Sequence, residues 1–347
     1  MLILELVITS RTGLDAIRSE IISEKTVQDM MANEQSMVIS PVQGRASSPR
    51  QLLAADELAM LNERSNLKGG MQLAKHLAVM AASGIIWATQ MEHWWLALPA
   101  LVVYGFSLAA MFATVHECGH RTAFANNRVN DVVAWWAGVL SFYNSTFYRR
   151  YHKWHHRFTQ IPGKDPELDD PKPASFKDYV VEVSAIPWWM GKVKTHTRIA
   201  MGHVQNYPFL PESAYGEVIR STRWQLAVYS GAIALSILAG HPWAVLLYWV
   251  LPMAVGQPLL RAILLAEHTG CTEDENPFTN TRTTLTMLPV RLLMWNMPYH
   301  AEHHLYPSMP FHALPAAYGK LSQHWQQVEH GYVTVNRKLV NALGKAA

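Results

Sequence analysis

Four long apolar runs set the strongest limit on what this chain can fold into. They extend over roughly residues 71–90, 94–115, 224–240 and 243–266. As a helix, the second run would span about 33 Å, enough to cross a bilayer core of about 30 Å. Three prolines interrupt the runs, and membrane helices tolerate proline better than soluble helices do. The pattern predicts an integral membrane protein with about four transmembrane helices.

The distribution of basic residues predicts the orientation of these helices. The runs pair into two hairpins, and the tight connections at 91–93 and 241–242 contain no Lys or Arg. The long segment 116–223 between the hairpins contains fourteen, including Arg149 and Arg150. By the positive-inside rule, this segment and both termini are expected on the cytoplasmic side.

The remaining segments complete the predicted fold class, an all-α integral membrane protein with two transmembrane hairpins. Residues 1–49 are polar and poorly periodic, so we expect a disordered N-terminal extension before one domain over 50–347. Residues 50–66 fit an amphipathic interfacial helix or a soluble cap helix equally well. The interrupted apolar stretches 132–147 and 183–194 are expected to be helices lying in the membrane interface.

Composition excludes several other classes of protein. Only 16% of the residues are charged, against about 25% in a typical soluble domain. The net charge of +3 and the lack of a basic stripe give no support to a nucleic-acid partner. Cys118 and Cys271 are the only cysteines, too few for a disulfide framework or a Cys-ligated zinc site. Seventeen histidines are the outlier.

Eight of these histidines fall in three clusters that the predicted topology places in one compartment. The first cluster is H-E-C-G-H at 116–120, and residues four apart share a helix face. The second and third repeat the pattern H-x-x-H-H at 152–156 and 300–304. The clustered residues, all candidate metal ligands, are His116, His120, His152, His155, His156, His300, His303 and His304.

The number of histidines favours a two-metal centre. A catalytic zinc needs only three protein ligands and a water, whereas eight imidazoles suit two ions of five or six coordination each. Imidazole-rich ligation with open positions suits iron and dioxygen. A distant alternative is an intramembrane zinc protease, because H-E-C-G-H matches H-E-x-x-H. It leaves six histidines unexplained. A non-enzymatic metal or haem carrier is a third class, although haem needs only one or two axial histidines.

The three histidine boxes, in this order and at these separations, resemble those of the membrane fatty-acid desaturase superfamily over about residues 94–325. "HECGH" is similar to the first box of acyl-lipid desaturases, and "NMPYHAEHHLYPSMPFHALP" resembles the third box and its tail in bacterial members. The resemblance implies a non-haem di-iron enzyme with membrane helices as a stem and a cytosolic helical cap that holds two iron ions. We therefore expect a multi-pass protein of a bacterial inner membrane.

The resemblance also implies a ninth metal ligand between the second and third boxes, and His268 in "LLAEHTGC" is the best match. In the stearoyl-type branch an Asn four residues earlier contacts a metal-bound water, but Leu264 stands there in this chain. Asn296, four residues before His300, is a candidate for a similar role. Three carboxylates beside the boxes could orient imidazoles or simply be solvated: Glu117, Glu267 and Glu302.

The other eight histidines are interpreted as structural or surface residues, and among them His203 is the hardest to set aside. They are His76, His93, His196, His203, His241, His312, His324 and His330.

The predicted reaction is a dioxygen-dependent desaturation of a fatty acyl chain, carried by a membrane lipid or an acyl thioester. Turnover needs two electrons, and no haem-binding or ferredoxin-like segment is visible. An external donor, ferredoxin-like or a b-type cytochrome, is therefore expected. Four basic residues could dock an acidic donor, although membrane topology explains them equally well. They are Arg149, Arg150, Lys153 and Arg157.

The alternative within the same superfamily is a hydroxylase or ketolase acting on a carotenoid, sterol or alkane. The box spacings permit both outcomes, because the same oxidant would serve either reaction. The residues that flank the third box favour the desaturase.

Overall fold

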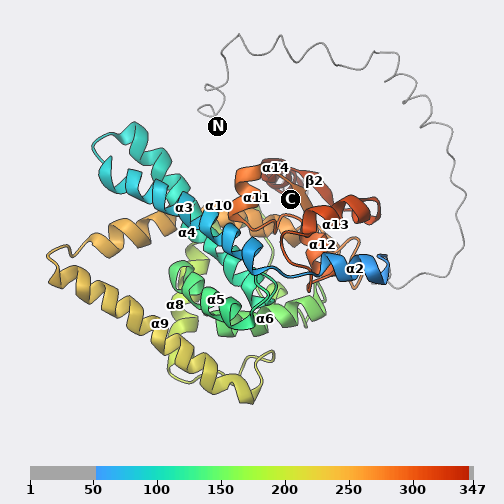
Figure 1. The fold of residues 1–347 in the computed structure, drawn as a ribbon, viewed down its shortest axis with the longest axis horizontal. Helices are drawn as coiled ribbons and strands as arrows, with labels where there is room; N and C mark the ends of the chain where they lie inside the picture. The colour runs from blue at the N-terminus through green and yellow to red at the C-terminus, as the bar shows by residue number, and fades with distance from the viewer. Residues whose placement is uncertain (1–51, 344–347) are drawn as a thin grey trace, which may run out of the picture. The chain divides into compact units, whose positions relative to one another are not determined.

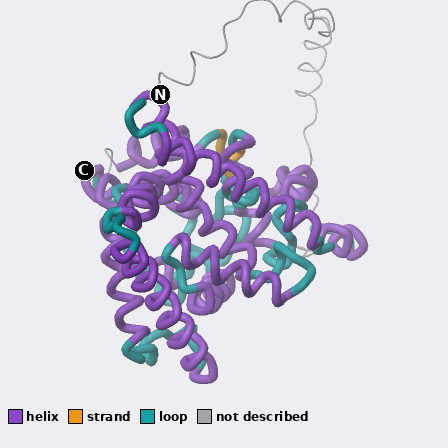
Figure 2. The backbone as a smooth tube through the Cα atoms, turned by 60° about the vertical axis from the view of Figure 1, so that its left-hand side comes forward, coloured by secondary structure: helices purple, strands orange, loops and turns teal. Residues whose placement is uncertain are grey.

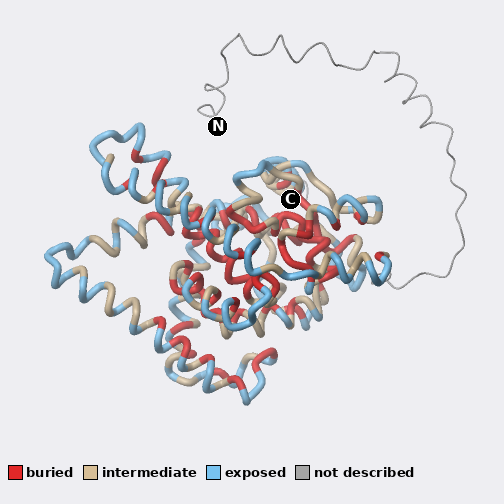
Figure 3. The backbone as a smooth tube through the Cα atoms, in the orientation of Figure 1, coloured by how far each residue is buried: buried red, intermediate tan, exposed pale blue. Residues whose placement is uncertain are grey.

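The computed structural model describes residues 52–343, so the predicted disordered extension over 1–49 lies outside the described residues. The described part of the chain is mostly helical (Figures 1 and 2). Two long helical hairpins and a set of shorter helices make up this part. The buried residues concentrate where the hairpins meet the short helices, whereas the far ends of the hairpins are largely exposed (Figure 3).

The first hairpin consists of α3 (Asn66–Thr89) and α4 (Trp94–Gly119). Helix α3 begins after Ser65, whose hydroxyl accepts a hydrogen bond from the backbone N–H of Lys68 at 3.2 Å. Helix α4 continues one turn beyond the apolar run, and its residues from Ser107 to Cys118 are buried. The first histidine box therefore forms the last turn of a membrane-length helix.

The second hairpin consists of α9 (Glu212–Leu238), the π-helical turn η3 (Leu246–Val250) and α10 (Leu251–His268). Helix α9 begins well before the apolar run, because its first turns pack Ala214 and Val218 into a separate buried cluster. Helix α10 ends at His268, as the sequence predicted.

The two hairpins pack together through a close backbone approach between α4 and α10. A Cβ atom at Gly256 would lie 1.9 Å from the carbonyl oxygen of Gly105, and one at Gly105 would lie 2.2 Å from that of Pro252. Nearer the hairpin ends, the indole N–H of Trp87 donates to the Leu247 carbonyl at 3.0 Å. Only glycine permits this approach, which fixes where α10 delivers His268 relative to the first box on α4.

Among the described residues, two helices are long and apolar enough to cross a membrane: Trp94–Gly119 and Leu246–His268. Helices α3 and α9 have the length but not the hydropathy, so only two of the four predicted spans meet this standard. The hairpin ends nevertheless expose large apolar side chains. Trp94 is 69% exposed, Trp243 is 67% exposed and Leu238 is 83% exposed. Exposed apolar surface of this kind marks contact with a membrane or a partner.

The shorter elements cover the end of the two hairpins that lies away from their connecting loops, which we call the inner end. They are α2 (Ala55–Leu61), α5 (Asn127–Ser141), α6 (Ser145–Phe158), η2 (Pro166–Leu168), α7 (Phe176–Val183), α8 (Ile186–Ala200), β1 (Thr283–Leu285), α11 (Leu288–Leu293), α12 (His300–Leu305), α13 (Leu314–Leu321), η4 (Ser322–His324), β2 (Val328–His330) and α14 (Tyr332–Leu343).

The two stretches predicted as single interfacial helices are each divided by a turn. Within 132–147, α5 ends at Ser141 and Phe142 has a left-handed backbone with φ of 59°. The Asn144 side chain then caps α6 by accepting from the backbone N–H of Thr146. Within 183–194, Ala185 at φ of 63° separates α7 from α8. The apolar run alone did not reveal these turns, because their residues are partly apolar themselves.

The packing of α2 favours the interpretation of residues 50–66 as a cap helix. Leu53 is buried, and Leu58 and Leu61 pack against the same cluster as Leu314 and Leu321 of α13. The leucine side of α2 therefore contacts protein.

The all-α prediction is wrong in one detail. Strands β1 and β2 pair in parallel, with Thr283 opposite Val328 and Leu285 opposite His330. Strands of three residues have too little alternation to be recognised in a sequence. The pair matters for the site, because the Thr283 hydroxyl donates to the Glu302 carboxylate at 2.6 Å and so anchors α12.

Replacing Gly256 by Ala tests the contact between α4 and α10. The new methyl group would collide with backbone, so we expect a loss of stability of about 3 kcal/mol. Thermal unfolding of the detergent-solubilised protein measures the effect. Gly70→Ala is the matched control, because a Cβ there meets nothing within 4 Å and alanine favours the helix. Equal melting of the two variants would contradict the assignment.

Candidate metal centre

All nine predicted site histidines converge at the inner end of the hairpins. Helix α4 brings His116 and its C-cap residue His120, and α6 brings the second box. Helix α10 contributes its last residue, His268, and α12 brings the third box. Four elements that are far apart in the sequence therefore meet at one place.

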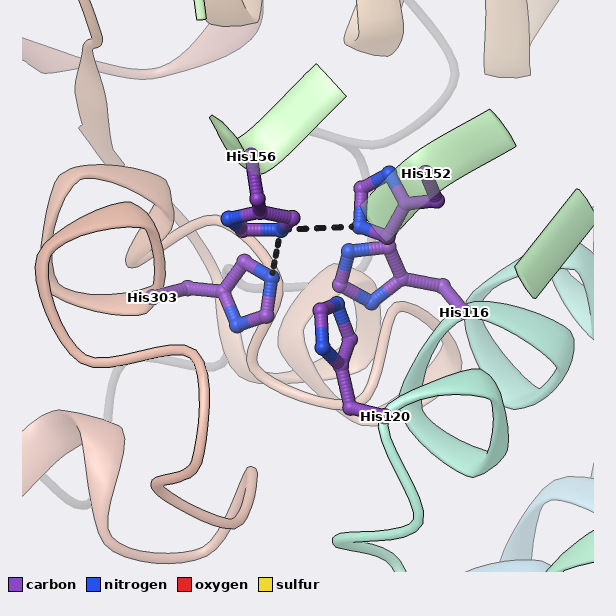
Figure 4. A group of neighbouring side chains, drawn as sticks. All are labelled: His116, His120, His152, His156 and His303. Carbon is purple, nitrogen blue, oxygen red and sulfur yellow. Dashed lines mark hydrogen bonds between the residues drawn. The ribbon is translucent and has the colours of Figure 1, made fainter. Parts of the chain in front are cut away.

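Five histidines form the first group (Figure 4). One ring nitrogen from each lies within 4.8 Å of those of the others. Nε2 of His156 lies 3.0 Å from Nε2 of His152 and 3.0 Å from Nε2 of His303. The members of this group are His116, His120, His152, His156 and His303.

The second group lies beside the first and contains His155, His268 and His304, whose ligand atoms also lie within 4.8 Å of one another. His300 adjoins it: its Nε2 lies 3.2 Å from Nε2 of His268 and 3.1 Å from Nε2 of His304. The H-x-x-H-H pattern is thus divided between the two groups. In each box the outer and inner histidines serve different centres.

Hydrogen bonds to Nδ1 fix the protonation of the second group. His155 donates its Nδ1 proton to both carboxylate oxygens of Asp165, at 2.9 and 3.0 Å. His268 donates from Nδ1 to the Asn280 carbonyl at 3.0 Å. The Thr159 hydroxyl gives its one proton to the His155 carbonyl at 2.9 Å, so at 3.1 Å it must accept the Nδ1 proton of His304. Each of the three rings, when neutral, therefore presents an unprotonated Nε2 to the common centre.

This arrangement fits bound metal ions. In the neutral tautomers that the Nδ1 hydrogen bonds favour, Nε2 of His155 and Nε2 of His304 face each other without a proton at 3.4 Å, so a cation between them would relieve their repulsion. A metal–imidazole bond is about 2.0–2.1 Å long, so two nitrogens bound at right angles lie about 3 Å apart. In the first group, Nε2 of His116 and Nε2 of His120 are buried without any hydrogen-bond partner. Buried, unpaired nitrogens are what a ligand set looks like without its ion.

Electrostatics keep the first group in the metal-binding form. Burial lowers the pKa of His120 to about 3 and lowers the pKa values of His152 and His303 well below the usual range. At neutral pH these rings carry free lone pairs. His155 differs, because the charge of Glu167 and the hydrogen bond to Asp165 outweigh burial and raise its pKa.

Of the three carboxylates singled out beside the boxes, only Glu267 faces an imidazole. Its Oε2 lies 3.4 Å from Nε2 of His300, and its Oε1 is buried without a partner. Glu117 instead accepts hydrogen bonds from the Thr122 hydroxyl and from the backbone N–H of Phe311. Glu302 accepts hydrogen bonds from the Thr283 hydroxyl and from the Trp325 indole N–H.

The role considered for Asn296 stays a prediction, although both ends of its side-chain amide have protein partners. The Asn296 amide donates to the Phe311 carbonyl and accepts from the Arg291 side chain, so it shapes the loop before α12. His203 is exposed, away from both groups. His76 is structural: one nitrogen lies 2.8 Å from the Ser107 carbonyl and the other accepts from Trp295 at 3.2 Å.

The positioning residues Asp165, Thr159 and Asn280 were not identified from the sequence. For Asp165, a spacing of ten residues from His155, across a turn, carries no local signal of their hydrogen bond. Asn280 contributes a backbone carbonyl, for which any residue type would serve.

The basic residues considered for donor docking divide into two kinds. Arg149 pairs with Asp131, and Arg150 pairs with Glu217 at 2.6 Å. Lys153 and Arg157 are exposed and make no ion pair within the described part of the chain. Only the second pair is free to meet an acidic partner.

Fold and site together define a mostly helical protein with two adjoining histidine groups, which could hold metal ions, at the inner end of membrane-length helices. Residues 92–336, more than half of the chain, match the sequence model of the fatty acid desaturase family. The chain belongs to that family, which confirms the resemblance of its histidine boxes. Family membership and the two apolar helices together indicate a membrane-associated protein.

Characterised relatives agree with this assignment. The chain is 26% identical to an sn-1 oleoyl-lipid 12-desaturase of Picosynechococcus over 72% of its length and 76% of the relative. It is 26% identical to dihydrorhizobitoxine desaturase of Bradyrhizobium elkanii, over 75% and 79%. A Delta(5) fatty acid desaturase of Caenorhabditis elegans is 23% identical, over 66% and 58%. Desaturases are oxidoreductases, and this chain is an enzyme of that class.

Asp165→Asn tests the hydrogen bond that orients His155. The amide no longer offers a fixed negative acceptor, so metal affinity of the second group should fall about 10- to 100-fold. Metal content after dialysis against a graded series of chelator concentrations measures it. Asp170→Asn is the control, because Asp170 is exposed. Identical metal retention in the two variants would remove Asp165 from the site.

Proposed function

We propose that this protein is a di-iron, dioxygen-dependent desaturase that introduces a double bond into a fatty acyl chain. The observation that carries the proposal is the convergence of nine histidines, three of them with the tautomer fixed so that Nε2 faces a shared centre. Imidazole-rich sites with open positions suit iron. Family membership supports the reaction, and the histidine geometry supports the cofactor.

Each of the two histidine groups would hold one metal ion. His116, His120, His152, His156 and His303 would hold one ion. His155, His268, His300 and His304 would hold the other, with Glu267 as a fifth donor. Two iron ions bound there would supply the reduction of dioxygen and the removal of hydrogen from an unactivated methylene.

The overall reaction sets what else the enzyme needs. Two hydrogens leave neighbouring methylenes, dioxygen takes them up with two further protons and two further electrons, and two waters form. An external donor, ferredoxin-like or a b-type cytochrome, would supply the electrons. The exposed pair Lys153 and Arg157 on α6, the helix that carries the second box, is the proposed docking point.

The protein would cross a bacterial inner membrane four times, with both termini and the metal centre on the cytoplasmic side. The exposed apolar side chains at the hairpin ends support this arrangement. So does the absence of Lys and Arg from both hairpin connections. An acyl chain of a membrane lipid or thioester could then reach the centre from the bilayer.

A zinc protease is not supported. Such an enzyme needs the glutamate of H-E-x-x-H free to act as general base. Here Glu117 is held by Thr122 at 2.6 Å and by the Phe311 N–H at 3.0 Å.

Products formed in a bacterial host test the function. The wild type should yield a new unsaturated fatty acid in mass spectra of total lipid methyl esters, and His303→Ala should abolish it. His203→Ala should keep it, because His203 is exposed and outside the centre. A hydroxy or keto product would instead identify the hydroxylase or ketolase alternative. A purified protein with no bound iron would overturn the di-iron proposal.

Glu267→Gln tests the fifth donor of the second group. An amide is a far poorer ligand than a carboxylate, so iron content should fall from two ions per chain toward one, while the first group keeps its ion. Iron analysis combined with Mössbauer spectroscopy distinguishes the two sites. Glu275→Gln is the control, since Glu275 is exposed. Two unchanged iron signals in Glu267→Gln would show that Glu267 is not a ligand.

A further inference from the structure

Helix α8 exposes apolar side chains and turns a cationic side chain toward the protein. Its exposed face carries Ile186, Met190 and Val193, whereas Lys192 lies on the inner side. The Lys192 ammonium sits 3.4 Å above the ring of Tyr143 and 5.4 Å from the ring of Trp188. A helix that turns apolar residues outward and a cation inward is facing a membrane on one side and a polar interior on the other.

A second cation reaches the same two rings from α10. The Arg261 guanidinium donates to the Tyr143 hydroxyl oxygen at 3.1 Å and lies 5.9 Å from the ring of Trp188. The Trp188 indole N–H donates to the same hydroxyl oxygen at 3.1 Å. Lys192 and Arg261 are therefore neighbours, held around one aromatic pair.

Among the described residues, neither cation forms an ion pair, and the two carboxylates that the charge of Arg261 influences, Glu167 and Glu267, lie beyond ion-pair distance. Within residues 52–343, no carboxylate lies within 4.0 Å of Lys192 or Arg261, and Nε of Arg261 is buried without a hydrogen-bond partner. Burial lowers the pKa of Lys192 well below its usual value, and the charge of Arg261 lowers it further. Two adjacent, partly buried cations are costly unless something negative lies between them.

Unpaired amide groups lie along the same helix face as Arg261. Gln257 precedes it by one turn, is 0% exposed, and has no partner at either Oε1 or Nε2. Residues 257, 261 and 268 share a face of α10, and Arg261 stands about 10 Å along the axis from His268. This face continues to His268 of the second histidine group, with Leu264 between Arg261 and His268.

Aromatic rings connect the cations to the first histidine group as well. The ring of Tyr143 lies 5.7 Å from that of Tyr148, and the Tyr148 ring stacks on His152 at 5.1 Å. A ligand bound at Lys192 and Arg261 would thus be separated from His152 by the rings of Tyr143 and Tyr148.

We propose that Lys192 and Arg261 form an anion-binding site that holds a carboxylate or phosphate group of the substrate beside the metal centre. Its role as a substrate site rests on the proposed function, but the binding of an anion does not. The charged groups facing it from the metal side are Glu167 and Glu267, and neither forms an ion pair with it.

Trp188, which belongs to the site, provides a fluorescence signal for the test. The purified protein in neutral detergent micelles is titrated with oleate and with oleyl alcohol, which has the same chain and no charge. We expect oleate to bind at least about tenfold more tightly. This preference should shrink in Lys192→Gln and in Arg261→Gln. Lys194→Gln should retain it, because Lys194 is an exposed lysine on the same helix.

Two further comparisons make the result decisive. Arg261→Lys keeps the charge and should keep part of the preference, which separates recognition from misfolding. Phosphatidylglycerol compared with phosphatidylcholine distinguishes a lipid phosphate from a free carboxylate as the source of the anion. Equal binding of oleate and oleyl alcohol, with no preference for phosphatidylglycerol either, would overturn the proposal. Iron content is measured in parallel, so a failed di-iron site would be seen separately from a failed anion site.

Discussion

The structure depends on the convergence of nine imidazoles, whose Nε2 atoms crowd one another in the protein interior. Nε2 atoms face each other at 3.0–3.4 Å in both histidine groups, and burial keeps most of the rings neutral. Such a set can be held together only by rigid elements, and four helices supply them. The glycine contact between α4 and α10 follows from the same demand, because it sets the separation of the first box from His268. Metal binding would then relieve the crowding of the Nε2 atoms, coupling stability to the metal.

The two groups are not equivalent. In the first, the Nδ1 atoms of His152, His156 and His303 have no partner, so packing alone orients the rings. In the second, Asp165, Thr159 and the Asn280 carbonyl each fix one ring. Hydrogen bonds that an imidazole N–H donates to carboxylates and carbonyls raise the basicity of that imidazole as a ligand. An ion in the second group would therefore see stronger donors and, through Glu267, an oxygen ligand. This asymmetry would give two metals bound there different electronic surroundings within one site.

The histidines of the candidate site could be predicted from the sequence, but the residues that orient them could not. Spacings of three and four residues within a helix carry a clear signal, so the three boxes could be predicted from the residues themselves, whereas His268 came from the resemblance to the desaturase superfamily. The turn at Phe142 and the strands β1 and β2 were missed, because a short turn or a three-residue strand has no periodicity. Asp165 and Thr159 were missed because their contacts with His155 and His304 depend on how the loop after α6 folds back. Glu117 and Glu302 are adjacent in sequence to histidines of the boxes, but their carboxylates accept hydrogen bonds from Thr122 and Thr283 instead of facing an imidazole.

The placement of charge and apolar surface explains how such a centre can sit at a membrane. Apolar side chains point outward at the hairpin ends and along α8, while Lys192, Arg261 and Gln257 point to the interior. In a soluble enzyme, the exposed apolar side chains and the inward-facing unpaired polar groups would both be unfavourable. At a bilayer surface the outward apolar side chains are solvated by lipid, and the inward polar groups need only a partner of the right charge. A substrate with a long apolar chain and one anionic end satisfies both requirements: its charge would be held at the cations while its chain passes the histidines. A neutral apolar substrate would leave two cations uncompensated, so the interior of the protein favours the charged one.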